Sequence, residues 1–201
     1  MACVLYLGDE SRRNAGGLVM KNRRIHVTGA SGSGTTALGR ALASALAVPH
    51  HDTDDYFWQP TTPPYRDKRD AAERLRLMRE MFLPRAQWVL SGSLQGWGDP
   101  AISYFDLVVF LYAAKDLRLH RLRAREAARF GDDAVSVGGW HHKETEDFIE
   151  WASHYDEGDT VSRTLEKHRA WLTSLPCPVI RLDGASPLSE LVTQVAATIG
   201  S

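Results

Sequence analysis

The chain has 201 residues, of which 43% are hydrophobic and 24% are charged, and its formal net charge is -1. This is the composition of a soluble globular protein with a substantial core. Without a basic excess we expect no nucleic-acid partner, and apolar runs well short of roughly 20 residues predict no membrane span. Two cysteines are too few for a disulfide framework, so we expect a cytoplasmic protein.

The first nineteen residues, "MACVLYLGDESRRNAGGLV", differ in character from the rest of the chain. They lack the charged start and the long apolar run of a signal peptide. Met20 then opens "MKNRRIHVTGASG", a natural start for a domain whose first element is its first strand. We therefore expect residues 1–19 to be an appendage and residues 20–201 to form a single domain. The alternative is that "CVLYL" adds an edge strand.

Apolar strand-like segments alternate with amphipathic helical ones along the rest of the chain. In chain order, we predict a strand at 24–29, a helix at 35–47, a strand at 48–52, a helix at 70–84, strands at 87–92 and 106–112, helices at 115–130, 144–155 and 160–175, a strand at 177–184 and a helix from 187. This alternation needs crossover connections, which favour a parallel sheet covered by helices on both faces. We therefore expect one α/β domain.

The segment "VTGASGSGTT", at 27–36, joins the first predicted strand to the first predicted helix. Its two outer glycines are separated by four residues, the frame of a phosphate-binding P-loop. In such a loop the backbone N–H groups point at phosphate oxygens, and the helix N-terminus adds partial positive charge. The predicted nucleotide-binding residues are Gly29, Ser31, Gly32, Ser33, Gly34, Thr35 and Thr36. The alternative is a tight turn without a ligand.

One residue of the loop departs from the P-loop pattern. Thr35 stands in the place of a lysine that bridges the outer phosphates and offsets charge in the transition state. Thr36 stands where a hydroxyl usually ligates the magnesium of a nucleotide. Threonine carries no charge, so a phosphoryl-transfer site of this kind needs positive charge from elsewhere in the chain.

The helix predicted at 115–130 supplies candidates for that charge. Arg118, Arg121, Arg125 and Arg129 follow one another at spacings of three, four and four residues, which puts them on one stripe. Like charges stacked in this way repel one another unless an anion meets them, and a polyphosphate is such an anion. The alternative is a solvated basic face.

The segment "HHDTDDYFWQP" follows the second predicted strand, where acidic side chains face the ligand crevice of an α/β protein. Asp52 and Asp54 are candidates to hold magnesium through water or to accept a proton from an attacking hydroxyl. Tyr56, Phe57 and Trp58 are candidates to stack on a planar substrate. The alternative is an Asp- and Pro-rich turn with aromatic side chains packed beneath it.

Two neighbouring features complete the candidate acceptor side. His50 and His51 precede these acids, but adjacent strand residues point to opposite faces, so we expect no zinc site there. The third strand ends in "SGSLQGWG", with Ser91 and Ser93 where many P-loop proteins carry an aspartate. The glycines around Trp97 predict either a ligand-lining loop or a tight turn. The candidate acceptor-binding residues are therefore Asp52, Asp55, Tyr56, Trp58, Ser93 and Trp97.

With these segments in this order, the chain resembles the nucleoside monophosphate kinase-like branch of P-loop proteins. That branch includes adenylate, cytidylate and shikimate kinases and the small bacterial topology modulation proteins, to which the likeness is greatest. The likeness is carried by "VTGASGSGTT", "HHDTDDYFWQP", "QWVLSGS" and "FDLVVFLYAAKDLRLHRLRAR". "GDTVSRTLEKH" is similar to the segment after the lid of adenylate kinases, where an arginine in the place of Arg163 contacts phosphates. Archaeal cytidylate kinases also look similar in having Thr-Thr after the last glycine.

The resemblance implies a P-loop NTPase fold with a five-stranded parallel sheet and a lid at about 130–146. It implies ATP and Mg²⁺ as cofactors, and the predicted metal residues are Thr36 and Asp54. Arg121 and Arg125 would close over the phosphates, Arg163 would contact them, and Asp54 or Asp52 would orient the acceptor. The predicted function is an ATP-dependent kinase that transfers the γ-phosphoryl group to a nucleotide or other small acceptor. The alternative is a nucleotide-binding regulator without transferase activity, and the sequence does not set the oligomeric state.

Overall fold

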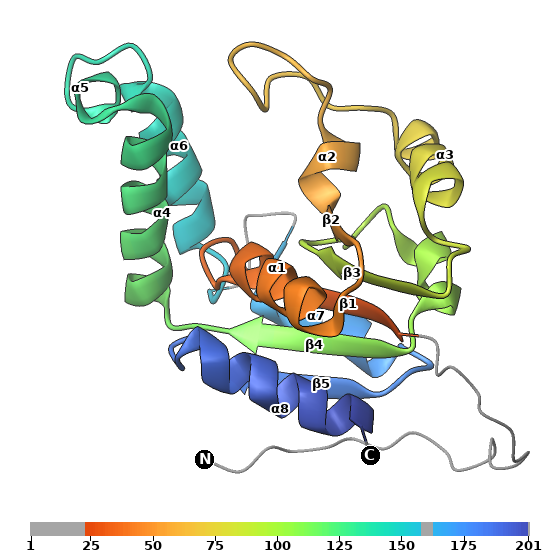
Figure 1. Ribbon diagram of the computed structural model, residues 1–201. Helices are drawn as coiled ribbons and strands as arrows, with labels where there is room; N and C mark the ends of the chain where they lie inside the picture. Colours follow the sequence, from red (N-terminus) through yellow and green to blue (C-terminus); the bar gives the residue numbers. More distant parts are fainter. Residues whose placement is uncertain (1–22, 158–162, 201) are drawn as a thin grey trace, which may run out of the picture.

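The computed structural model describes residues 23–157 and 163–200 of the chain, and the predicted N-terminal appendage at 1–19 lies outside them. A parallel five-stranded sheet in the order β2-β3-β1-β4-β5 forms the centre of the molecule (Figure 1). The strands are β1 (Arg23–Gly29), β2 (His50–Asp52), β3 (Gln87–Ser91), β4 (Leu107–Tyr112) and β5 (Val179–Asp183). The predicted α/β class and the five strands are confirmed.

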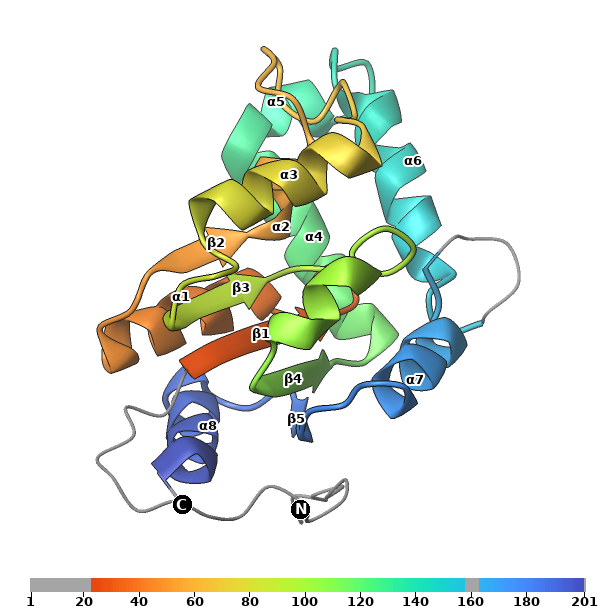
Figure 2. The same cartoon turned by 90° about the vertical axis from the view of Figure 1, so that its right-hand side faces the viewer.

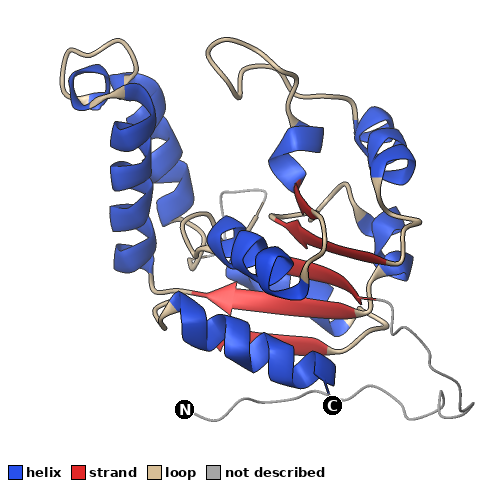
Figure 3. Cartoon of the chain, in the orientation of Figure 1, coloured by secondary structure: helices blue, strands red, loops and turns tan. Residues whose placement is uncertain are grey.

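Helices cover the sheet and extend beyond its carboxyl edge (Figure 3). They are α1 (Thr35–Leu46), α2 (Thr53–Phe57), α3 (Ala71–Met81), the 3-10 helix η1 (Asp99–Tyr104), α4 (Lys115–Phe130), α5 (Asp132–Val135), α6 (His142–Ser153), α7 (Leu165–Thr173) and α8 (Leu188–Gly200). The pattern predicted the long helices but missed α2, η1 and α5, which are too short to repeat an apolar stripe. None of the described helices combines the length and apolar character that a membrane span requires.

Two apolar layers fill the space between the sheet and the helices that cover its faces. Figure 2 shows these helices around the sheet. Alternate strand residues point to opposite faces, so Ile25 and Val27 of β1 join the layer under α1 and α8. On the other face, Trp88 and Leu90 of β3 pack with Met78 of α3, and η1 and α7 complete that layer. Because both faces are covered, ligands have access to the sheet only at its edges, and the carboxyl edge carries the predicted motifs.

Two projecting parts of the chain stand above that carboxyl edge (Figure 1). On one side, α4 and α6 pack against each other through Leu122, Ile149 and Ala152, with α5 at the tip of the pair. On the other side stand α2 and the loop that leads to α3. The predicted lid segment at 130–146 corresponds to this tip and the first turn of α6.

A buried polar seam, formed by Thr28, Tyr155 and His168, connects β1 to α7 and to the segment after α6. Tyr155 Oη lies 2.7 Å from Nδ1 of His168, and Nε2 of the same ring lies 3.5 Å from Thr28 Oγ1. His168 is 1% exposed. Burial lowers the pKa of His168 from 6.5 to about 3, and the nearby charge of Arg163 lowers it further. The folded protein therefore keeps this imidazole neutral.

This seam makes stability depend on pH. Below about pH 6.5 the unfolded chain protonates His168 while the folded chain does not, so acid favours unfolding until about pH 3. We predict that His168→Gln makes the unfolding free energy fall less steeply between pH 6 and pH 4, by up to about 1.4 kcal/mol per pH unit. Urea unfolding at several pH values measures this, and identical slopes for the two proteins would contradict it.

Candidate active site

A cavity of about 550 Å³ opens at the carboxyl edge of the sheet, between the α4–α6 pair and the α2 side. Its floor is formed by the loop after β1, its walls by α2, the loop after β3, α4 and α6. The predicted site residues on its lining are Gly29, Ser31, Gly32, Thr35, Thr36, Asp52, Asp54, Trp58, Ser93, Trp97, Arg125 and Arg163. A volume of this size suits a ligand of cofactor dimensions.

The loop from Gly29 to Gly34 has the conformation of a phosphate cradle. Gly32 and Gly34 have φ of 81° and 103°, a region in which side-chain-bearing residues are strained. Gly34 caps α1, so the first amides of that helix have no partner within it. A Cβ on Gly29 would overlap the carbonyl oxygen of Leu111, so β4 packs too closely for any larger residue. The floor of the cavity is therefore an N-terminus suited to anions.

Two arginines of α4 hold this loop from the side away from the cavity. Nη1 of Arg118 donates to the carbonyl oxygen of Ser31 at 3.4 Å. Nη1 of Arg121 donates to the carbonyl oxygens of Ser33, at 3.3 Å, and Gly184, at 2.9 Å. Neither arginine lines the cavity. In a trans peptide the N–H points away from the C=O, so the N–H groups of Gly32 and Gly34 are directed away from these arginines. The N–H of Ser33 instead donates to the carbonyl oxygen of Ala30 at 3.1 Å and closes the turn.

The predicted arginine stripe is thereby divided between two roles. Arg118 is fully buried, paired with Asp156 and bonded to the carbonyl oxygen of Ala152, so the expectation that it faces a polyphosphate is wrong. Arg125 and Arg129 do line the cavity. Both guanidinium groups are tethered by the buried carboxylate of Glu126, at 3.1 Å and 3.6 Å. Of the four arginines in the stripe, only Arg125 and Arg129 therefore place positive charge on the cavity wall.

An acidic side chain does lie beside Ser91 at the end of β3, but it comes from the end of the neighbouring strand β2. Asp52 is the register partner of Ser91 on β3, and its Oδ2 accepts hydrogen bonds from Ser91 Oγ at 3.0 Å and Thr36 Oγ1 at 2.8 Å. Its Oδ1 accepts the backbone N–H of Asp54 and caps α2. One carboxylate thus joins the phosphate cradle to the α2 wall.

Asp54 and Arg163 are charged residues that both line the cavity. Asp54 is accessible to water there, but the surrounding walls exclude much of the bulk solvent, and this together with the charge of Asp52 raises the pKa of Asp54. The positive charges of Arg163 and Arg125 act in the opposite direction. Burial also lowers the pKa of Arg163, whose guanidinium lies 5.2 Å above the Trp151 ring.

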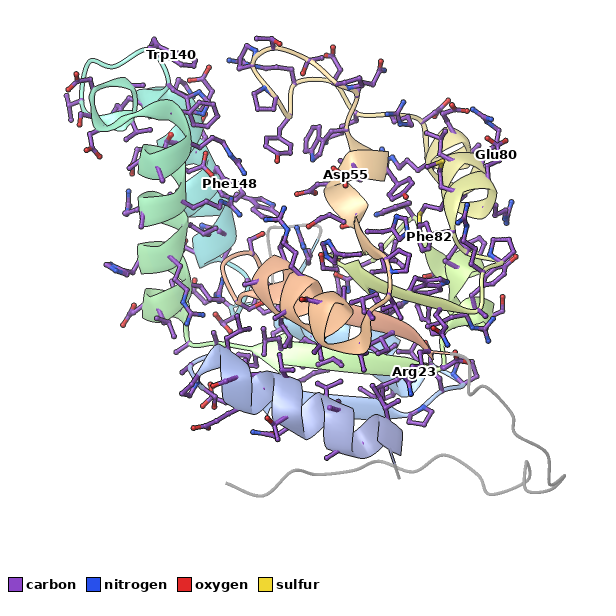
Figure 4. All side chains as sticks on the ribbon, viewed as in Figure 1. Arg23, Asp55, Glu80, Phe82, Trp140 and Phe148 are labelled. Carbon is purple, nitrogen blue, oxygen red and sulfur yellow. The ribbon has the colours of Figure 1, made fainter. Side chains whose placement is uncertain are left out.

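Aromatic rings form much of the remaining wall. Phe57, Trp58 and Trp97 contribute from the α2 side, and the ring centroids of Phe57 and Trp97 are 6.0 Å apart. Phe148 and Trp151 face them from α6, where Figure 4 labels Phe148. These two were missed by the sequence interpretation, although their spacing of three residues puts them on one helix face.

Two predicted acceptor residues lie outside the cavity lining. Tyr56 is 7% exposed and packs in the core, with its hydroxyl 2.9 Å from Nδ1 of His51. The structure thus places this ring beneath the wall rather than on it. Asp55, on the same helical turn, is exposed but does not line the cavity. The predicted P-loop residues Ser33 and Gly34 also lie behind the lining, where they shape the turn.

No protein-family model matches the chain. The chain is 40% identical over 179 residues to the Uncharacterized protein YqaC of Bacillus subtilis (strain 168), a match that covers 89% of this chain and 98% of YqaC. The chain belongs to the YqaC family. Its features described above are therefore those of one member of the YqaC family.

Solved structures share the fold of this YqaC-family chain. A shikimate kinase from Aquifex aeolicus vf5 aligns with a TM-score of 0.51 at 15% identity, over 88% of this chain and 96% of that one. An uncharacterized protein from Eubacterium ventriosum ATCC 27560 aligns with a TM-score of 0.50 at 13% identity, over 89% and 99%. At these identities the likeness shows a shared fold and does not extend to activity. The finer resemblance to topology modulation proteins stays a prediction.

The buried arginine of this YqaC-family protein gives a stability prediction. Replacing Arg118 by Met leaves Asp156, 22% exposed, without its partner, so we expect a loss of about 3 kcal/mol in unfolding free energy. Arg123→Met, on the same helix, is the matched control, because its pair with Glu146 is half exposed and is worth less than about 1 kcal/mol. Urea unfolding compares them, and equal losses would contradict a special role for Arg118.

Proposed function

We propose that this protein is an ATP-dependent kinase that transfers the γ-phosphoryl group of ATP to a small acceptor. The observation that carries the proposal is one cavity lined by two chemically different sets of residues. The glycine cradle with Thr36 and Asp52 forms one set, and Asp54 with the aromatic walls forms the other. A cradle alone supports nucleotide binding, whereas further acidic and aromatic lining in the same cavity supports transfer to another molecule.

The residues at the cradle fit Mg²⁺ together with a nucleotide. Mg²⁺ prefers oxygen ligands and is usually held by one or two carboxylates, nucleotide phosphates and water. Thr36 and Asp52 supply a hydroxyl and a carboxylate in contact with each other. Among the described residues, no group of three His, Cys, Asp or Glu side chains forms a metal cage, so phosphate oxygens would have to complete the set. When bound, the ion would neutralise charge on the phosphates.

The chain's own groups would do the rest by positioning and by charge. Amides of the cradle would bind the phosphates, and Arg125 and Arg163 would offset charge that develops on the transferred group. Asp54 would accept a hydrogen bond from the acceptor hydroxyl and orient it. Its raised pKa makes this carboxylate a better proton acceptor than an ordinary aspartate. Positive charge from Arg125 and Arg163 would thus replace the lysine that Thr35 does not provide.

The acceptor compartment favours a ring-shaped acceptor. Trp58 and Trp97 on one wall and Trp151 on the other present flat apolar surfaces, and charged groups such as Asp54 and Arg163 line the same cavity. Such walls suit a base or a sugar ring, which stack on aromatic faces. This proposal includes nucleotides and nucleosides as acceptors but is not limited to them.

A panel of acceptors tests the proposed function. Nucleoside monophosphates, nucleosides and small ring alcohols are each incubated with ATP and Mg²⁺, and ADP release is compared with the rate without acceptor. We expect at least one acceptor to stimulate release, and Asp54→Asn to abolish the stimulation while ATP still binds. ATP binding with no stimulated release by any acceptor would instead favour the nucleotide-binding regulator.

The division of the arginine stripe gives a second prediction. Arg125→Ala removes a charge from the cavity wall, so we expect kcat to fall by about 10³-fold while the Kd for ATP changes much less. Arg123→Ala, two residues away and directed at Glu146 outside the cavity, should leave both values unchanged. Steady-state kinetics and ATP titration measure them. Full activity of Arg125→Ala would refute the replacement of the lysine by this arginine.

A further inference from the structure

A hydrogen-bonded chain reaches the proposed metal position from outside the cavity. Nε2 of His50 lies 2.9 Å from Ser91 Oγ, which donates to Asp52 Oδ2 at 3.0 Å. Thr36 Oγ1 donates to the same carboxylate oxygen at 2.8 Å. His50 itself does not line the cavity. The His50–Ser91–Asp52 chain therefore connects a half-buried imidazole to the carboxylate beside the Thr36 hydroxyl.

The donors and acceptors of this chain have only one consistent direction. A serine hydroxyl carries one proton, and that of Ser91 is given to Asp52. The contact with His50 must then be one in which Ser91 accepts, so Nε2 of His50 carries the proton. The reverse tautomer would turn the Ser91 proton away from Asp52.

A glycine in α1 leaves room for this contact. An ideal Cβ on Gly39 would lie 2.8 Å from Cβ of Ser91 and 2.9 Å from Nε2 of His50, too close for either. A glycine within a helix costs roughly 0.5–1 kcal/mol relative to alanine. Three elements, α1, β2 and β3, thus meet at a point that only a residue without a side chain permits.

We propose that His50 is a positioning residue of the metal site, which fixes the Ser91 hydroxyl toward Asp52 and so holds that carboxylate aimed at Thr36. Ser91 and Thr36 donate to Oδ2 of Asp52 and the Asp54 N–H donates to Oδ1, so the carboxylate is held in one orientation, and the lone pairs of Thr36 are left for the ion. Partners that orient metal ligands in this way commonly change metal affinity by about 10–100-fold. This inference rests on the proposed function, because it takes Mg²⁺ with ATP as the ligand.

Calorimetric titration with a non-hydrolysable ATP analogue, adenylyl imidodiphosphate, tests the role without needing the acceptor. Each protein is titrated once with Mg²⁺ and once with EDTA, and the ratio of the two Kd values is the metal-dependent gain. His50→Leu removes the donor, His50→Gln retains an N–H at a comparable reach, and Gly39→Ala inserts a methyl group into the contact. His120→Leu, an exposed histidine of α4, is the control.

We expect the gain to fall about 10-fold or more in His50→Leu and in Gly39→Ala, with metal-free affinity unchanged. In His50→Gln and His120→Leu the gain should stay within about threefold of the wild type. An undiminished gain in both His50→Leu and Gly39→Ala would overturn the positioning role alone. Equal losses with and without metal would make His50 a packing residue and also overturn it. A wild type that does not bind the analogue would overturn the proposed function as well.

Discussion

The reversal of the chain between β1 and α1 is the constraint on which the rest of the site depends. Two glycines at positive φ make the turn, and Arg118 and Arg121 hold its carbonyl oxygens outward. Burying a guanidinium completely is costly unless all of its donors are used, and Arg118 uses its donors on Asp156 and three backbone carbonyls. Through that arginine, the phosphate cradle is tied directly to the C-terminal end of α6.

The second organising feature is the position of the acid. With Ser91 at the end of β3, the carboxylate comes from the neighbouring strand, and parallel register sets Asp52 directly beside that hydroxyl. Because Asp52 also caps α2, the side chain that touches Thr36 orients the helix that carries Asp54 and is followed by Trp58. A change at the glycine loop would therefore be transmitted to the α2 wall through a single residue.

Sequence patterns predicted the repeating parts of this structure well. Strands buried on both faces are continuous apolar runs, and the long helices carry apolar stripes, so both were predicted close to their observed bounds. The P-loop frame was also predicted from the sequence, since glycines at fixed spacing reflect backbone geometry. Helix α2 was missed because its five residues depend on a cap from Asp52 rather than on periodicity.

What the sequence did not indicate was the direction of individual side chains. Arg118 and Arg125 belong to one predicted stripe, yet one is enclosed by α6 and the loop after β1 while the other reaches the cavity. Tyr56 and Trp58 are two residues apart, but only Trp58 lines the cavity. The sequence gives His50 no role once a zinc site is rejected. Its contact with Ser91 joins residues 41 positions apart, which local pattern does not encode.

The central claim is that the site is built around Thr35, with charge supplied from the cavity walls. The most direct measurement is ATP turnover by Thr35→Lys compared with the wild type, under identical Mg²⁺ and acceptor conditions. The account predicts that lysine gives no gain and lowers turnover, because Arg125 and Arg163 already supply the charge beside the cradle. A turnover at least about 10-fold faster than the wild type, a barrier lower by about 1.4 kcal/mol, would contradict it.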